Sequence, residues 1–324
     1  MKSRQNTVLF ALVLGGAVGA AIVLRLRGIP YITQEKQWSI GIYTGASPLD
    51  LHAASGVSNP VLSARDVTDV PAKFVADPFL IQRDATWYMF FEVLNADNGR
   101  GEIGFASSDD TRHWRYGRIV LAEPFHLSYP YVFAADGIYY MIPESGAAQS
   151  VRLYTSDDFP THWVFVDTLL SGSAFADSSL VRFGNTWFLF TEARPYVNDT
   201  LGLYVADALT GPWRAHPQSP IVANNPHSSR PAGRIVATNG TLLRFAQDDS
   251  PNYGTQVFGF EITTLTATTY AERPVGAAPI LRPGDDGWNA KGMHQIDAHQ
   301  VGEHEWIACV DGAQRHWTVR VYPR

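Results

Sequence analysis

The chain contains 324 residues, of which 45% are hydrophobic and 17% are charged. This composition is typical of a globular protein with a large core and argues against disorder. The formal net charge is -6, and basic residues do not cluster beyond the N-terminal segment, so no nucleic-acid partner is expected. The single cysteine, Cys309, lies in an apolar strand-like run and is expected to be a packed core thiol.

The first predicted element is a membrane span from Thr7 to Leu24. This segment has no charged residue, and basic residues flank it on both sides; a bilayer core needs about 20 apolar residues. A cleavable signal peptide is the alternative, because Val18–Ala20 is a possible small-residue cleavage site. The apolar run continues past this site to Leu24, which favours an uncleaved anchor.

The anchor determines the expected domain organisation. We predict a cytoplasmic stub at residues 1–6, the transmembrane anchor at 7–24, a linker at 25–36 and one domain at 37–324. A short N-terminal stub before a large C-terminal domain usually stays in the cytoplasm. We therefore expect a single-pass membrane protein whose bulk is periplasmic, or lumenal if the source is eukaryotic.

The sequence then repeats one unit three times, in Ala76–Glu92, Ser128–Glu144 and Ala176–Glu192. Each copy contains two runs of β-branched or aromatic residues separated by a turn signal, which predicts a β-hairpin. A third run and a second turn that ends in tryptophan follow each hairpin. The copies recur about every 50 residues, and four strands per unit at this period predict the blades of a propeller.

Two looser copies complete the pattern. The fourth begins at Arg230, and the fifth runs from His294 to the C-terminus. The fifth copy is one strand short, and Trp38–Gly45 can supply that strand and close the ring without an unpaired edge. No helical periodicity follows the anchor. We therefore predict an all-β protein, a five-bladed β-propeller preceded by one N-terminal transmembrane helix.

Acidic residues recur at both ends of the predicted hairpins. Asp77 and Asp177 lie at the start of the first strand, and the second strand ends at Glu92, Glu144 or Glu192. In a propeller the innermost strand lines the central channel and the hairpin returns to the same face, so one funnel should collect these carboxylates. Such a cluster suits glycosidic bond cleavage, with one carboxyl as acid and another as base or nucleophile. Mutual repulsion raises at least one pKa and keeps an acid protonated.

A structural explanation competes with the catalytic one. Aspartate at a strand start and glutamate at a strand end often satisfy backbone amides, and repeats copy such residues. The final glutamates fit both explanations. Asp77 and Asp177 are replaced by Tyr129 in the second copy, which favours a functional interpretation in which each blade contributes a different side chain to one pocket.

The fourth copy places other polar groups in the funnel. Arg230 occupies the starting position, and Gln247 and Asp248 follow the hairpin. The arginine fork can bind a substrate carboxylate or phosphate. Alternatively it pairs with Asp177 or Glu192, and the sequence does not separate these two roles.

The fifth copy begins at His294, which can hydrogen-bond sugar hydroxyls. His294, His299 and His304 are five residues apart, a spacing that matches no common zinc pattern. We therefore expect neither a metal nor a cofactor.

The strings SYPYVFAADGIYYMIPES, SRPAGR and GMHQID resemble the propeller domain at the N-terminus of plant glucosamine inositolphosphorylceramide transferases and its bacterial relatives. The resemblance covers roughly Trp38–Arg324. That domain is similar to the five-bladed propellers of arabinanases, xylosidases, invertases and levansucrases. The resemblance implies that Asp77 is the base or nucleophile and that Asp177 tunes a pKa. Arg230 stands where such enzymes commonly have a glutamate, and the plant transferase module has no counterpart here, so transferase activity is not expected.

The sequence supports two alternative functions. The first is hydrolysis of a glycosidic bond in a glycan or glycolipid headgroup, with catalytic residues drawn from Asp77, Glu144, Asp177 and Glu192. The second is non-catalytic binding of a saccharide or glycolipid beside a partner glycosyltransferase. In both cases the expected substrate-binding residues are Glu92, Tyr129, Arg230, Gln247, Asp248 and His294.

Overall fold

The computed structural model describes residues 29–238 and 240–322. The described residues divide into two units: residues 37–314 form one compact unit, and residues 29–36 with 315–322 belong to the other. The predicted anchor, Thr7–Leu24, lies outside the described residues. Among the residues that are described, no helix has the length and apolar character needed to cross a membrane.

The described chain is built from strands, with two short 3-10 turns, η1 (Ala64–Asp66) and η2 (Gly146–Ala148). In chain order the strands are β1 (Ile29–Ser47), β2 (Asp50–Ala53), β3 (Ala72–Arg83), β4 (Thr86–Asn95), β5 (Gly101–Ser108), β6 (Arg115–Leu121), β7 (Ser128–Ala135), β8 (Ile138–Glu144), β9 (Ser150–Asp158), β10 (His162–Ser171), β11 (Ala176–Phe183), β12 (Thr186–Glu192), β13 (Leu201–Ala206), β14 (Arg214–Ala215), β15 (Val236–Thr238), β16 (Thr241–Asp248), β17 (Gln256–Leu265), β18 (Tyr270–Pro274), β19 (Ile296–Gly302) and β20 (Glu305–Tyr322).

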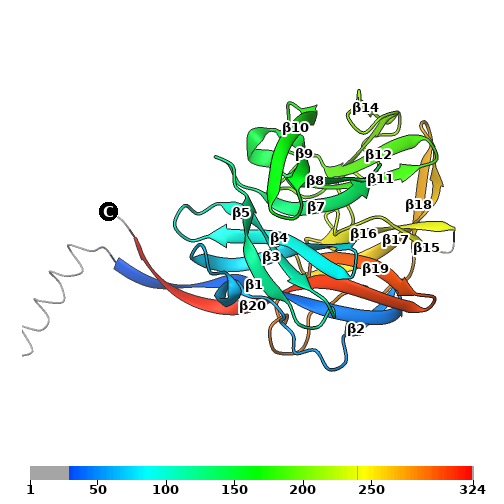
Figure 1. The fold of residues 1–324 in the computed structure, drawn as a ribbon. Helices are drawn as coiled ribbons and strands as arrows, with labels where there is room; N and C mark the ends of the chain where they lie inside the picture. Colours follow the sequence, from blue (N-terminus) through cyan, green and yellow to red (C-terminus); the bar gives the residue numbers. More distant parts are fainter. Residues whose placement is uncertain (1–28, 239, 323–324) are drawn as a thin grey trace, which may run out of the picture. The chain divides into compact units, whose positions relative to one another are not determined.

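These strands form five four-stranded sheets, which are the five blades of a propeller (Figure 1). Four blades consist of consecutive strands, β3 to β6, β7 to β10, β11 to β14 and β15 to β18. The fifth has the order β19-β20-β1-β2, so the blue start and the red end of the described chain lie side by side in one sheet. The predicted closure by the strand that contains Trp38 is confirmed, and with it the all-β propeller.

Aromatic side chains fill the spaces between blades and pack edge to face. The ring of Phe90 on β4 lies 5.4 Å from that of Trp163 in the second blade, and Phe79 on β3 lies 4.8 Å from Tyr129 on β7. Such pairs add stability beyond the burial of their area. The tryptophan that ends the turn of the second blade, Trp163, is buried and donates its indole N–H to the carbonyl of Pro160 in the same turn.

Side chains from two blades and the backbone of Gly233 are hydrogen-bonded at the hub of the ring. The Tyr129 hydroxyl donates to Ser179 Oγ at 2.8 Å and accepts the Gly233 N–H at 2.6 Å, while Ser179 donates to the Gly233 carbonyl. Gly233 has φ 133°, and a Cβ there would lie 1.7 Å from the carbonyl oxygen of Ile296, so only glycine fits. The buried thiol of Cys309 donates to the Pro78 carbonyl at 3.2 Å, as expected for a packed core cysteine. These contacts fix the inner strands relative to one another.

Candidate active site in the acidic funnel

The inner strands of the first three blades share an unusual backbone conformation at the second residue of the repeated unit. Asp77, Tyr129 and Asp177 have φ values of 53°, 45° and 48°, in the left-handed region that L-residues rarely adopt. Their N–H groups turn toward acidic side chains: Asp77 donates to Asp311, Tyr129 to Asp77 and Asp177 to Glu144, at 3.2 to 3.3 Å. The strand starts therefore gather carboxylates at the hub, as the sequence predicts.

Asp77 belongs to a buried group that also contains His294 and Asp311. Nδ1 of His294 lies 2.7 Å from Oδ2 of Asp311, and its Nε2 lies 3.6 Å from Oδ1 of Asp77. Oδ1 of Asp311 accepts the backbone N–H groups of His294 and Gln295. Trp38 stacks on the imidazole with 4.0 Å between ring centroids. The imidazole is therefore held in one orientation between two aspartates.

The surroundings raise the pKa of both His294 and Asp77, and burial has the opposite effect on each. Burial lowers the pKa of His294, but the charge of Asp311, its hydrogen bond to the imidazole and the charge of Asp77 outweigh burial and raise it to about 9. Burial raises the pKa of Asp77 well above its usual value, and the charge of His294 opposes this rise. His294 is thus a cation at neutral pH that stabilises the ionised form of Asp77.

Arg230 bridges the second and third blades. Its Nε donates to Oδ2 of Asp177 at 2.5 Å, and its terminal nitrogens donate to Oε2 of Glu144 at 3.4 Å and to Oδ1 of Asn198 at 3.1 Å. The Tyr253 ring lies 5.0 Å from the guanidinium carbon. Of the two roles left open by the sequence, the structure supports the ion pair with Asp177, and it adds Glu144 as the second partner instead of Glu192.

Glu144 has the environment of a carboxyl that holds its proton. Burial and the charge of Asp177 raise its pKa well above the usual value, while Arg230 opposes the rise. Its side chain is 19% exposed and lines a pocket of about 410 Å³ together with Arg230 and Tyr253. It can therefore reach a bound ligand while remaining protonated.

The other predicted binding residues divide into two groups. Gln247 lies in the site, because its amide donates to Oδ2 of Asp177 at 2.6 Å. Asp248 is buried in its own blade, where its oxygens contact His227 and Gln256 at 2.8 Å. Tyr129 is fully buried, and the hub uses its hydroxyl. Asp248 and Tyr129 were predicted to touch substrate, and their positions give that role no support.

Glu192 is fully buried and faces a loop of its own blade. Oε1 accepts the N–H of Arg194 at 2.7 Å, and both oxygens lie 3.3 Å from the N–H of Thr200. Burial raises its pKa, and these amides oppose the rise. Of the two predicted acids, Glu144 lines the pocket and Glu192 supports a loop.

Glu92 lies beside a histidine that the sequence analysis did not select. Nε2 of His126 is 3.2 Å from Oε1 of Glu92, and Nδ1 of the same ring accepts the Gly101 N–H at 2.9 Å. Because Nδ1 is an acceptor, the ring proton is on Nε2 and points at Glu92. The charge of Glu92 contributes to the raised pKa of Asp77, and His126 lines the pocket.

One group among the described residues has the spacing of a metal site: Asp77, His294 and Asp311. The oxygens of Asp311 already accept three backbone N–H groups and lie against the imidazole. A cation would have to displace these donors. The three residues therefore fit a hydrogen-bonded triad better than a metal centre.

Sequence reasoning missed Asp311 and Trp38. Asp311 lies within β20, the second strand of the fifth blade, five residues after Trp306, just as Glu92 and Glu192 each follow a tryptophan by five residues. That spacing could have identified Asp311 as the fifth counterpart of the final glutamate. No comparable signal marks Trp38, because only closure of the ring brings it over His294.

A five-bladed propeller with acidic and basic side chains gathered at its hub is the class of protein that this fold and site define. The family of the N-terminal domain of glucosamine inositolphosphorylceramide transferase 1 matches residues 32–313. The chain belongs to this family.

Curated relatives agree with the family match. The glucosamine inositolphosphorylceramide transferase 1 of Oryza sativa subsp. japonica is 36% identical over 299 residues, which are 86% of this chain and 40% of the relative. The protein of the same name from Arabidopsis thaliana is 32% identical over 300 residues, 86% of this chain and 39% of the relative. The chain thus spans about two fifths of the length of these relatives.

Solved structures share the fold at low sequence identity. A β-1,2-mannobiose phosphorylase from Listeria innocua aligns with a TM-score of 0.60 and 13% identity, over 83% of this chain and 96% of that one. The catalytic domain of a GH62 α-L-arabinofuranosidase from Coprinopsis cinerea aligns with a TM-score of 0.57 and 13% identity, over 86% and 97%. The propeller is therefore similar to those of glycoside hydrolases.

Proposed function

We propose that this protein is a carbohydrate-active propeller that cleaves a glycosidic bond of a glycan or glycolipid headgroup in the acidic funnel. The observation that carries the proposal is the pairing of two differently held carboxyls in one hub. Burial raises the pKa of both Glu144 and Asp77, and a different cation opposes the rise at each carboxyl, Arg230 at Glu144 and His294 at Asp77. Two carboxyls with separate cationic partners can serve as the acid and base of glycoside cleavage.

In this mechanism Glu144 donates its proton to the leaving oxygen of the bond that is cleaved. Its position on the pocket wall supports this role. Asp77 acts as the base that activates water or as the nucleophile, and the Tyr129 N–H and His294 stabilise its negative charge. Asp177 touches no reacting atom in this scheme; it raises the pKa of Glu144 and fixes Arg230.

The proposed substrate class comes from the family. Its curated relatives are named for transfer of glucosamine to inositolphosphorylceramide, so we propose a glycolipid headgroup or related glycan as the ligand. On the sequence alone we also propose that residues 7–24 anchor the protein in a membrane with the propeller periplasmic or lumenal. A glycolipid substrate would then lie in the same membrane as the enzyme.

The test is a screen for sugar release by the full-length protein in detergent. The substrates are a panel of p-nitrophenyl glycosides and glycosylated inositolphosphorylceramide in mixed micelles. Asp77→Asn and Glu144→Gln should each reduce turnover by about 100-fold or more, the usual effect of removing a general acid or base. Glu261→Gln, a surface change in the fourth blade, serves as the matched control. Turnover that survives both funnel changes would refute the assignment.

A second function, binding without cleavage, is favoured by one observation. Arg230 lines the pocket and pairs with both Asp177 and Glu144, and this pairing compensates carboxylate charge that a catalytic cluster would use. A binding module would place a glycolipid headgroup for a partner glycosyltransferase. Retention of glycolipid by wild-type protein and by Asp77→Asn alike, without released sugar, would establish this second function instead.

A further inference from the structure

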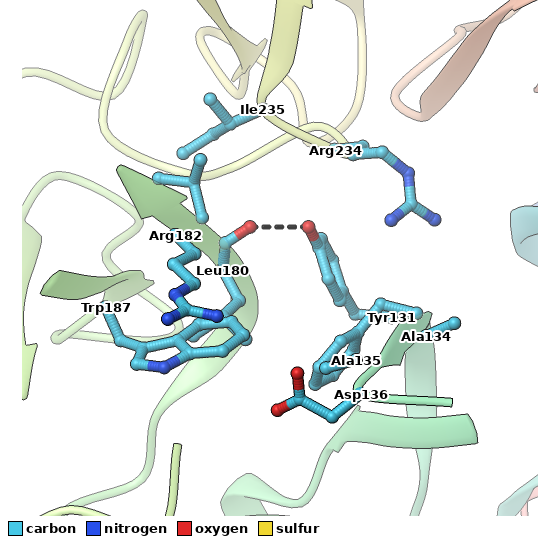
Figure 2. A pocket seen from close by; sticks show the side chains of 11 residues that line it. Tyr131, Ala134, Ala135, Asp136, Leu180, Arg182, Trp187, Arg234 and Ile235 are labelled. Atoms are coloured by element: carbon cyan, nitrogen blue, oxygen red, sulfur yellow. Dashed lines mark hydrogen bonds between the residues drawn. The ribbon is translucent and has the colours of Figure 1, made fainter. Parts of the chain in front are cut away.

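A second pocket lies at the other end of the same inner strands. Strands β7 and β11 begin in the acidic funnel and end at this pocket, which has a volume of about 330 Å³. At about 3.3 Å per residue, the length of β7 separates the two sites by roughly 20 Å. The residues that matter for its chemistry are Tyr131, Phe133, Asp136, Arg182, Trp187 and Arg234 (Figure 2).

Hydrogen-bonded side chains of the hub lie between the ends of the inner strands. Tyr129 is fully buried and is hydrogen-bonded to Ser179 and Gly233. Arg234, which lines the second pocket, donates to the Val132 carbonyl at 2.8 Å and pairs with Asp297 at 2.8 Å. The second pocket shares no lining residue with the pocket of Glu144, so the two are distinct.

One wall of the pocket is rigid and aromatic. The Tyr131 hydroxyl donates to the Leu180 carbonyl at 2.5 Å, the contact drawn as a dashed line in Figure 2. The Arg234 guanidinium carbon lies 4.8 Å from the Tyr131 ring centroid, and the rings of Phe133 and Trp187 are 6.3 Å apart. These contacts hold the wall in place before any ligand arrives.

Two charged side chains complete the pocket. Arg182 is exposed, and its guanidinium carbon lies 5.7 Å from the centre of the Trp187 ring. Asp136 is exposed at the turn between β7 and β8. Within the described part of the chain neither side chain makes an ion pair. In Figure 2 Arg182 and Trp187 lie on one side of the pocket and Asp136 on the other.

An aromatic wall with one exposed cation and one exposed anion favours a saccharide as the ligand. A saccharide ring offers hydroxyls that both donate and accept hydrogen bonds, and it has apolar C–H faces that pack on aromatic walls. Arg182 can donate to such hydroxyls and Asp136 can accept from them. A phosphate fits less well, because Asp136 repels it and the charge of Arg234 is already compensated by Asp297.

We propose that the second pocket is a saccharide-binding site that holds one neutral sugar unit, separate from the acidic funnel. The proposal does not depend on the reaction assigned to the funnel, because it requires binding only. The second pocket could then hold a glycan or a glycosylated partner while the acidic funnel binds a different saccharide chain.

The test is calorimetric titration of the full-length protein, in a detergent without a sugar headgroup. The probes are D-glucose, D-galactose, D-mannose and N-acetyl-D-glucosamine, with sodium phosphate as the anion arm. At least one sugar should bind. Arg182→Ala should weaken that binding about tenfold, and Asp136→Asn, which keeps a residue that tolerates the turn conformation, should weaken it several-fold.

Two control variants make the result specific. Arg83→Ala removes an exposed arginine of the first blade that stacks at 5.7 Å on Phe159 of the second blade and should leave binding unchanged. Asp77→Asn alters only the funnel and should also leave it unchanged. The proposal is overturned if no sugar binds, if phosphate alone binds, or if binding is lost in Asp77→Asn and kept in Arg182→Ala. Loss of turnover in Asp77→Asn with intact sugar binding would separate the two sites.

Discussion

Nε of Arg230 lies 2.5 Å from Oδ2 of Asp177, and the side chains are 12% and 2% exposed. This buried ion pair joins the start of the fourth blade to the start of the third. Replacing Arg230 with glutamine leaves Asp177 and Glu144 buried without their cation. Removing one member of such a pair typically costs about 3–5 kcal/mol, so urea denaturation of Arg230→Gln should show a loss of this size.

Arg273→Gln is the control for that measurement. Arg273 pairs with Glu261 at 2.6 Å, but its side chain is 67% exposed, and exposed pairs contribute about 0–1 kcal/mol. Arg230→Lys should give an intermediate loss, because a lysine keeps the charge and cannot form the fork. If Arg230→Gln proves no more costly than Arg273→Gln, the ion pair does not hold the blades together.

The pairing of His294 predicts how stability depends on pH. Its folded pKa of about 9 is higher than the unfolded value near 6.5, so the stabilisation is fully present below pH 6.5 and lost as pH rises through 9. The full contribution is about 3 kcal/mol at about 1.4 kcal/mol per pKa unit. The difference in unfolding free energy between wild type and His294→Gln should be largest near pH 6 and shrink by this amount toward pH 10.

The same pH series on His113→Gln provides the comparison. His113 also contacts an aspartate, Asp110 at 2.7 Å, but its side chain is 88% exposed. The stability difference between wild type and this variant should stay small across the range. A stability difference for His294→Gln that does not change with pH would mean that the imidazole is not charged in the folded protein.

The fold could be predicted because the sequence signals that define each blade lie close together in the chain. Each blade carries its own hairpin pattern and turn residues, and strand β1 follows from the shortage of one strand in the last copy. The second residue of the repeated unit is Asp77, Tyr129 or Asp177, and the sequence favours a role in which each blade contributes a different side chain to one pocket. In the structure it is first a backbone position with left-handed φ, which aspartate tolerates better than most residues.

The partners within the site could be predicted only in part. Arg230 was placed at the funnel with two possible roles, and only contacts between blades select Asp177 and Glu144. The burial of Tyr129 likewise depends on Gly233, about a hundred residues further along the chain. Hydrophobic pattern specifies which face of a strand is buried, but it does not specify which polar groups meet across a hub.

Tyr129→Phe tests whether this tyrosine supports the hub or binds substrate. The change removes a hydroxyl that donates to Ser179 and accepts from Gly233, leaving the buried Gly233 N–H without its acceptor. Such a loss costs about 1–3 kcal/mol, which thermal or urea denaturation would detect. Tyr204→Phe is the control, because no hydrogen bond of its hydroxyl is found among the described residues. If Tyr129→Phe has normal stability but binds glycan more weakly, Tyr129 binds substrate and does not support the hub.

Glu192→Gln and Glu144→Gln together decide which glutamate is the acid. Glu192 accepts the N–H groups of Arg194 and Thr200, so glutamine should weaken the loop between them and lower stability by about 1–3 kcal/mol. Both N–H groups belong to this loop, and faster hydrogen–deuterium exchange of the Arg194 and Thr200 amides would report the loosened loop. Turnover should stay within a few-fold of wild type, because the carboxylate oxygens of Glu192 accept the loop amides of its own blade, whereas Glu144→Gln should lose about 100-fold or more without loosening the loop. The reverse pattern, an inactive Glu192→Gln protein with wild-type stability and unchanged exchange of these two amides, would make Glu192 the proton donor and leave Glu144 as a partner of Arg230.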